Sequence, residues 1–237
     1  MVRAEQHRPG HRSVSGGAAR AAVFGVSDGL VSNVSLILGF AASGVDDEIV
    51  RLAGLAGAVA GAISMAAGEW ISISAQNELI DREVSVERRA IAGNAAGETA
   101  ELVAMYRTDG MSAAVAEAAA ADVMANPDRA LTVHTRAEMG IDPLSLPSAL
   151  KAAVISFLCF VVGAMLPLLP WLAGASGAAP AFTSLALGVV AAGFVGAAIG
   201  RFAERSVPAS VIRQIVIVLV ACAVTYAIGE LFGVNMS

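Results

Sequence analysis

Charged and aromatic residues are both scarce in this sequence of 237 residues. Asp, Glu, Lys and Arg make up 15% of the chain and Phe, Trp and Tyr 5%, whereas 57% is hydrophobic. An ordinary soluble domain carries about 25% charged residues, so the composition indicates a membrane protein. Cysteine is scarce as well. Cys159 and Cys222 lie inside apolar runs, where we expect buried thiols rather than a disulfide or a metal site.

Histidine is too rare, and too badly placed, for an intramembrane metalloenzyme. The three histidines are His7, His11 and His134; none lies in an apolar run, and there is no His-Glu-x-x-His motif. We therefore expect a protein that is not an enzyme, with no prosthetic group and no nucleic-acid partner.

Five apolar segments are long enough to cross a bilayer, which takes about 20 residues. They cover residues 18–42, 51–75, 149–173, 181–202 and 207–232. The sequence thus predicts an all-α membrane protein with two membrane regions, 18–75 and 149–237. Residues 1–17 are polar and basic, and we expect a disordered tail there rather than a cleavable signal peptide.

Residues 76–148 differ in composition from the rest of the chain. They contain twelve acidic and six basic residues, so this segment alone carries more negative charge than the whole chain, at −5. We predict that the second span continues as a helix to Ala92, breaks at Gly93-Asn94-Ala95, and is followed by helices over 97–108, 112–125 and 127–139. The expected product is a small α-helical hairpin domain outside the membrane.

Several polar side chains lie within the first two spans, where a carboxylate is costly and indicates a functional site. Asp28, Ser32 and Asn33 belong to the first span, and Met65 and Glu69 to the second. Because Met65 and Glu69 are four residues apart, they share one helix face. A thioether and a carboxylate on one face are plausible ligands for a transition-metal ion. For Asp28, a structural cap near the membrane surface is the competing interpretation.

The acidic residues of 76–148 offer a second candidate metal site. Glu83 and Glu87 continue the helix face that carries Glu69. Glu98 and Glu101 are three residues apart, and His134 and Glu138 are four apart, so each pair points the same way on its helix. Carboxylates and an imidazole from separate helices can converge on one divalent ion. A solvated acidic face is the alternative.

The arginines and the lysine near the span ends predict the orientation. They gather before the first span, around residues 76–151 and between the fourth and fifth spans, whereas the other loops lack them apart from Arg51. We expect the N-terminus and the acidic domain in the cytosol and the C-terminus outside, most simply in a prokaryotic inner membrane.

Several motifs occur in an order that resembles the vacuolar iron transporter family. They are Asp28-Gly29-Leu30-Val31-Ser32-Asn33, Ser64-Met65-Ala66-Ala67-Gly68-Glu69-Trp70-Ile71-Ser72, Glu87-Arg88-Arg89, Glu138-Met139-Gly140-Ile141-Asp142-Pro143 and Gly163-Ala164-Met165-Leu166-Pro167-Leu168-Leu169-Pro170. The resemblance covers nearly the whole chain beyond residue 17, with no ferritin-like module before the first span. It implies a homodimer in the bilayer that exports Fe²⁺ from the cytosol in exchange for protons and often tolerates Mn²⁺, Co²⁺ or Zn²⁺.

The resemblance also assigns roles. It implies an ion path along the two-fold axis, with Asp28 and Met65 as membrane ligands and Glu69 nearby, and cytosolic ligands at Glu87, Glu98, Glu101 and Glu138. Two positions depart from the family pattern. Ala90 stands where a further glutamate is expected, and His134-Thr135 stands where eukaryotic members have two methionines. Both a Mn²⁺-selective exporter and a membrane metal sensor that moves no ions remain alternatives.

Overall fold

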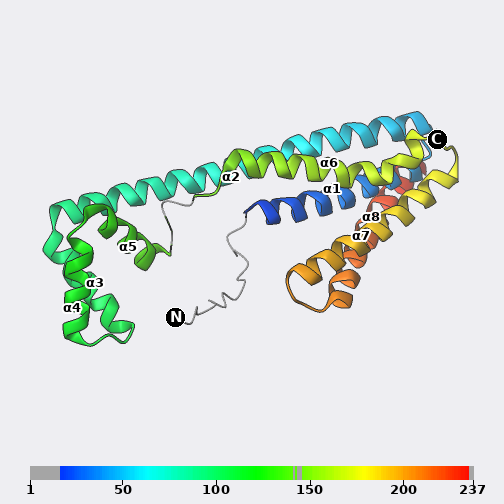
Figure 1. Ribbon diagram of the computed structural model, residues 1–237. Coiled ribbons are helices and arrows are strands. Elements are labelled where there is room, and N and C mark those ends of the chain that lie inside the picture. Colours follow the sequence, from blue (N-terminus) through cyan, green and yellow to red (C-terminus); the bar gives the residue numbers. More distant parts are fainter. Residues whose placement is uncertain (1–16, 141, 143–145, 235–237) are drawn as a thin grey trace, which may run out of the picture. The chain divides into compact units, whose positions relative to one another are not determined.

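The computed structural model describes residues 17–140, 142 and 146–234. The predicted basic tail therefore lies outside the described residues, except for Gly17. Within the described ranges every regular element is a helix (Figure 1). The helices are α1 Gly17–Ala42, α2 Asp47–Gly93, α3 Ala95–Thr108, α4 Ala113–Met124, α5 Pro127–Met139, α6 Ala149–Leu172, α7 Ala178–Phe202 and α8 Val207–Val234.

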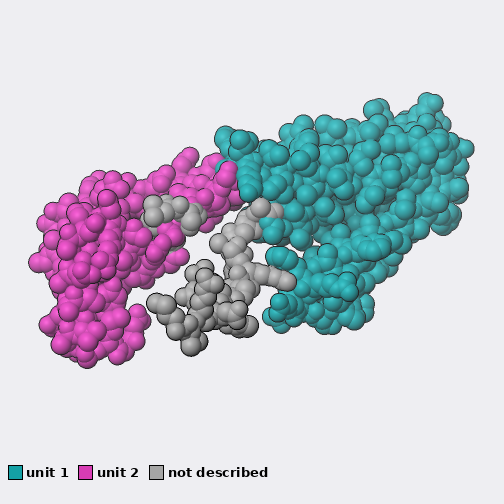
Figure 2. Space-filling view, viewed as in Figure 1, with its two compact units in different colours: residues 1–70, 149–237 teal, residues 71–148 magenta. Residues whose placement is uncertain are grey.

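Five of these helices, α1, α2, α6, α7 and α8, are long and apolar enough to span a membrane. This confirms the predicted all-α fold with five spans. The chain divides into two compact units, coloured separately in Figure 2: residues 1–70 with 149–237, and residues 71–148. We refer to them as the membrane unit and the polar unit. Helix α2 contributes its apolar part to the first and its polar part to the second.

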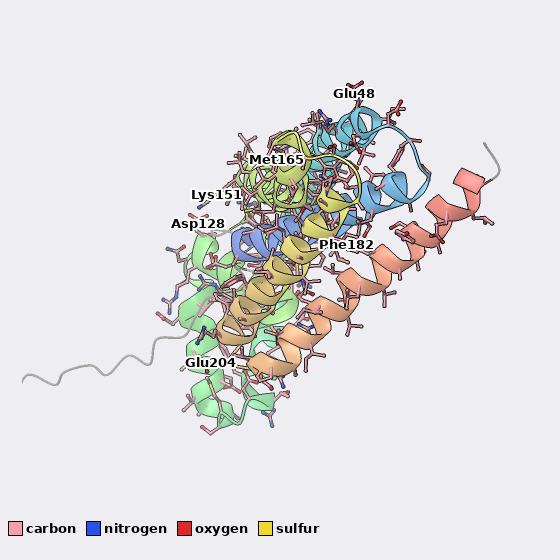
Figure 3. All side chains as sticks on the ribbon, turned by 90° about the vertical axis from the view of Figure 1, so that its right-hand side faces the viewer. Glu48, Asp128, Lys151, Met165, Phe182 and Glu204 are labelled. Carbon is pink, nitrogen blue, oxygen red and sulfur yellow. The ribbon has the colours of Figure 1, made fainter. Side chains whose placement is uncertain are left out.

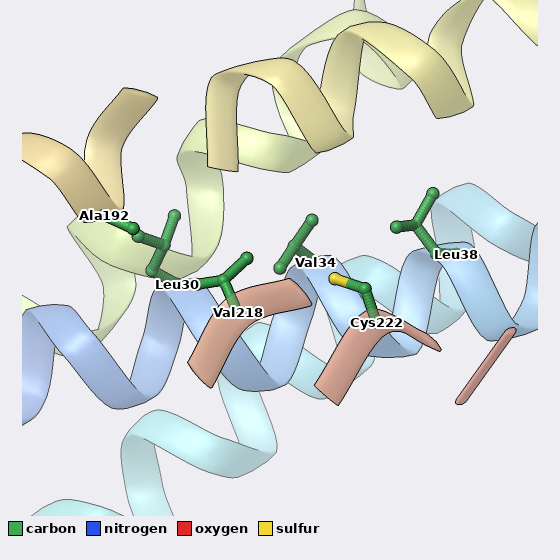
Figure 4. Packing of buried hydrophobic residues seen from close by; sticks show 6 residues of the cluster. All are labelled: Leu30, Val34, Leu38, Ala192, Val218 and Cys222. Carbon is green, nitrogen blue, oxygen red and sulfur yellow. The ribbon is translucent and has the colours of Figure 1, made fainter. Parts of the chain in front are cut away.

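In the membrane unit, α1 packs directly on the backbones of α6 and α8. A Cβ atom on Gly29 would lie 2.1 Å from the carbonyl oxygen of Phe160, and one on Gly229 of α8 would lie 2.0 Å from the carbonyl oxygen of Gly39. Glycine is therefore required at both contacts. Figure 4 shows the adjacent core cluster of Leu30, Val34 and Leu38 of α1 with Ala192, Val218 and Cys222.

The polar unit follows its sequence signals closely. The Asn94 side chain accepts a hydrogen bond from the Gly97 N–H (3.2 Å) and caps α3. Asn126 caps α5 by accepting from the N–H groups of the second and third residues after it, with Pro127 in the first turn. Gly140 ends α5 at φ 66°, a conformation that favours glycine. Small and aliphatic side chains fill the core between α3, α4 and α5: Leu102, Ala120, Val123 and Ala130.

Candidate metal centre

Four side chains from three helices converge inside the polar unit. Glu87 comes from α2, Glu98 from α3, and His134 and Glu138 from α5. One ligand atom from each lies within 4.8 Å of all the others, and no other group of this kind occurs among the described residues. We call these four residues the Glu₃His cluster.

The imidazole of His134 lies at the centre of the cluster. Its Nδ1 is 3.2 Å from a carboxylate oxygen of Glu138, 3.3 Å from one of Glu87 and 3.8 Å from one of Glu98. Two ligands bound to the same divalent ion at about 2.1 Å lie roughly 3.0–3.4 Å apart in octahedral or tetrahedral geometry. The spacing of the four groups therefore fits a shared ion after small side-chain adjustments.

Because the cluster is buried, its carboxylate charges are energetically unfavourable without a bound cation. His134 is fully buried and Glu87 is 7% exposed. Oε1 of Glu87 and Nε2 of His134 are buried and lack a hydrogen-bond partner. Burial raises the pKa of Glu87 above its ordinary value, and the neighbouring Glu138 carboxylate raises it further, against the opposing effect of His134. A bound divalent cation would offset the repulsion and give the carboxylates a partner.

Two of the glutamates singled out from the sequence lie outside this set. The Glu83 carboxylate is ion-paired with Arg82. Glu101 is exposed, yet close enough to help raise the pKa of Glu87. The neighbour of His134 on α5, Thr135, donates its hydroxyl to the carbonyl of Leu131 and thus back into its own helix. The structure therefore brings together four candidate ligands of the six predicted in this unit.

The membrane unit contains a hollow between α1, α2 and α6 that is lined by both polar and apolar residues. Its volume is about 340 Å³. Asp28, Ser32 and Asn33 line it from α1 and Met65 lines it from α2, so it collects four of the five residues assigned to a transport path. The other lining residues are Leu36, Gly57, Gly61, Ser64 and Phe160. We call it the α1–α2 hollow.

Asn33 presents a free oxygen in this hollow. Its Nδ2 donates a 2.7 Å hydrogen bond to the carbonyl of Ala164, which fixes the amide. Its Oδ1 is buried and has no hydrogen-bond partner, although the residue is only 2% exposed. An unpaired buried oxygen in the same lining as Asp28 is suited to a cation or to a water molecule carried with one.

Glu69, the fifth path residue, is not part of the hollow lining. Its Oε1 accepts a 2.8 Å charge-assisted hydrogen bond from Arg20, at the start of α1. Sequence spacing did not reveal this partner, because the two residues lie 49 positions apart on different helices. Gly57, Gly61 and Ser64 also line the hollow, although they were not among the residues predicted from the sequence. Their four- and three-residue spacing was a usable signal, because it places them near one face of α2.

Comparison with known proteins identifies the chain. The VIT family profile matches residues 19–230. Vacuolar iron transporter 1 of Oryza sativa subsp. japonica is 28% identical over 224 residues, which is 94% of this chain and 89% of that protein. The vacuolar iron transporter of Acanthamoeba castellanii is 34% identical over 195 residues, 80% of this chain and 71% of that protein. Vacuolar iron transporter homolog 1 of Oryza sativa subsp. japonica is 34% identical over 222 residues, 91% of this chain and 74% of that protein. The chain thus belongs to the VIT family of membrane transporters.

Proposed function

We propose that this protein carries Fe²⁺ out of the cytosol in exchange for protons and also accepts Mn²⁺, Co²⁺ and Zn²⁺. As a VIT family member it is a transporter of metal ions and not an enzyme. The observation that carries the ion path is the α1–α2 hollow, where Asp28 and Met65 line one space within the membrane unit. A carboxylate at membrane depth is costly unless it serves a path or a partner.

In this mechanism the Glu₃His cluster collects the ion from water before the membrane step. Three carboxylates attract divalent cations, and the imidazole favours Fe²⁺, Co²⁺ and Zn²⁺ over ions that prefer oxygen ligands alone. In the α1–α2 hollow, Met65 and Asp28 then replace part of the hydration shell. Asp28 is compensated by either a metal ion or a proton, so the release of one is linked to the uptake of the other.

A homodimer is part of the proposal. In the single chain, Asp28, Ser32 and Ser64 are exposed although they line the hollow. Polar side chains of a membrane span face protein or water rather than lipid. A second copy covering this side of α1 and α2 would enclose the path and double its ligands by symmetry.

The proposed location is a prokaryotic inner membrane, with the polar unit and the N-terminus in the cytosol and the C-terminus outside. Arginine placement supports this orientation. Arg20 lies in the first turn of α1, and Arg201 and Arg205 lie at the α7–α8 connection. The positive-inside rule assigns both places to the same side as the polar unit.

Transport into sealed proteoliposomes tests the function. Fe²⁺ and Mn²⁺ uptake is measured with and without an imposed pH gradient, for the unmodified protein and for Asp28→Asn. We expect uptake that the gradient drives and that Asp28→Asn abolishes. Glu117→Gln is the matched control, because Glu117 is exposed on α4, far in sequence from both sites.

Each alternative has its own outcome in this experiment. Gradient-driven Mn²⁺ uptake without Fe²⁺ uptake would identify a Mn²⁺ exporter. Binding of either ion without uptake would identify a sensor. Undiminished uptake through Asp28→Asn would refute the assigned path.

A further inference from the structure

A second and larger cavity in the membrane unit has no role in the proposed transport path. Its volume is about 680 Å³, within the range of about 300–1,000 Å³ that is typical of ligand sites. It lies between the end of α1, the start of α2, the end of α6, the start of α7 and the second half of α8. We call it the α7–α8 cavity. Asp28 and Met65 do not line it.

The wall of this cavity is mainly apolar. Leu38, Val50, Trp171, Leu185 and Leu219 supply much of it. None of its lining residues is among the described residues whose buried polar side-chain atoms lack a partner. Water occupies a cavity only where it finds several polar partners. The wall therefore offers water few hydrogen-bond partners.

The lining contains few polar groups, and most of them already interact with another polar group of the protein. The Asp47 carboxylate accepts a 3.2 Å hydrogen bond from the N–H of Gly177, just before α7. The thiol of Cys222 lies 3.8 Å from the hydroxyl of Ser35. The hydroxyl of Tyr226 interacts with Glu230 one turn later on α8. Asp47 is the first residue of α2, so its carboxylate lies at one end of the cavity.

The outer side of the cavity is bounded by side chains that suit hydrocarbon. Phe182 of α7, labelled in Figure 3, is 73% exposed, and Leu219 and Tyr226 of α8 are 44% and 46% exposed. These residues belong to membrane-spanning helices, so the medium around their exposed faces is lipid. A mainly apolar space that opens toward lipid fills with lipid tails, because an empty one would forfeit dispersion contacts along its wall.

We propose that the α7–α8 cavity binds one acyl chain of a membrane phospholipid, with its head group beside Asp47. The acidic residues Asp47 and Glu48 in the first turn of α2, with Asp46 just before it, favour a head group with an ammonium over a purely anionic one. The bound chain packs against Leu38 of α1 and Val50 of α2. It thereby fills the space between α7–α8 and the two helices that line the transport hollow.

The chain provides its own reporter for this site. It contains two tryptophans, and Trp171 lines the cavity while being only 1% exposed. In a Trp70→Phe protein, Trp171 is the sole tryptophan. We compare its emission in vesicles that contain phosphatidylethanolamine with brominated acyl chains and in vesicles of the same composition with the unbrominated lipid. Bromine quenches tryptophan at short range, so we expect loss of most of the Trp171 emission.

A cavity-filling variant separates a bound chain from lipid around the protein. Ala223→Phe, added to Trp70→Phe, places a ring at an exposed residue of the cavity lining, and it should restore most of the emission. Ala209→Phe is the matched control, because Ala209 is also exposed on α8 but does not line the cavity. It should leave the quenching unchanged.

Several results would overturn the proposal. Equal emission in brominated and unbrominated lipid shows that no acyl chain enters, as when a second copy fills the cavity. Equal quenching in the Ala223→Phe and Ala209→Phe proteins shows that the bromine acts from outside. If brominated phosphatidylglycerol quenches as strongly as brominated phosphatidylethanolamine in an equimolar mixture with unbrominated lipid, the head-group assignment fails.

Discussion

Replacing Glu87 by glutamine should make the metal-free polar unit more stable and lower its affinity for metal ions. Glu87 is almost fully buried, and a ligand oxygen of it lies within 4.8 Å of ligand oxygens of Glu98 and Glu138. Glutamine keeps the size and shape of the side chain and removes one negative charge. The substitution therefore tests electrostatics rather than packing.

Coulomb's law sets the size of the effect. Two unit charges 4.8 Å apart repel by about 0.9 kcal/mol at a dielectric constant of 80 and about 3.5 kcal/mol at 20. Glu87 faces two carboxylates, and that of Glu138 is 28% exposed, so water screens part of the repulsion. We apply the value for a dielectric constant of 80 to both repelling pairs, Glu87 with Glu98 and Glu87 with Glu138. On this basis we expect Glu87→Gln to stabilise the metal-free unit by about 2 kcal/mol.

Amide hydrogen exchange on the full-length protein measures this change. With a chelator present, about 2 kcal/mol corresponds to exchange that is roughly 30-fold slower in α3–α5 wherever exchange requires opening of the unit. With Co²⁺ or Fe²⁺ added, the unmodified protein should instead be more stable than the variant, because the metal binds it more tightly and stabilises it more. Glu83→Gln is the matched control, since Glu83 lies one turn earlier on α2 but outside the cluster.

The pH dependence follows from the same charge. The folded-state pKa of Glu87 is raised, chiefly by burial and next by Glu138. The metal-free unit thus loses stability as the pH rises through that pKa, and Glu87→Gln should remove this loss. Faster exchange of the variant with chelator present, or an unchanged stabilisation by metal, would refute the placement of Glu87 in a metal site.

Three further predictions follow from single contacts. His134→Ala should lower the affinity of the polar unit for Co²⁺ by at least about tenfold, measured by visible absorption, because the central nitrogen of the cluster is lost; an unchanged affinity would exclude it as a ligand. Arg20→Ala should free Glu69 and lower the metal concentration for half-maximal uptake by up to about fivefold, as an exposed ion pair is worth up to about 1 kcal/mol; in Glu69→Gln the same change should have no effect. Gly29→Ala should prevent a monodisperse preparation, since the Cβ would lie 2.1 Å from a carbonyl oxygen of α6, whereas Gly193→Ala, with nothing within 4 Å, should be tolerated.

The helices were predictable because their end signals are local. Gly93-Asn94, Asn126-Pro127 and Gly140 each end or begin a helix within two residues of the predicted position. Ser112 shows the limit of such signals. The helix predicted over 112–125 begins at Ala113, and the side chain of Ser112 before it makes no capping hydrogen bond.

The candidate sites were only partly predictable from sequence. The four-residue spacing of His134 and Glu138 on α5 indicated that they share a face, and the structure brings them together. Glu98 and Glu101 carried a similar signal, yet only Glu98 joins the Glu₃His cluster. The rotation of α3 about its own axis decides which of the two carboxylates faces α2 and α5. That rotation depends on the packing of Leu102 in the core.

Contacts between spans that are far apart in the sequence correspond to no periodic pattern of residues. The donation from Asn33 to the carbonyl of Ala164 joins residues 131 positions apart. The α7–α8 cavity is likewise a property of five helix ends, each of which is an ordinary apolar sequence on its own.

The backbone contacts of α1 determine which helices can move during transport. At Gly29 and Gly229 the helices touch with no side chain between them, so α1 cannot rotate or slide without carrying α6 and α8 with it. Helix α2 instead meets its neighbours through side chains, as where the Phe160 ring lies against Gly61, and side chains can change rotamer. We therefore expect alternating access to come from motion of α2 against a frame of α1, α6 and α8. In the proposed path, Asp28 lies on α1 and Met65 on α2, so motion of α2 would assemble the coordination sphere and take it apart again in each cycle.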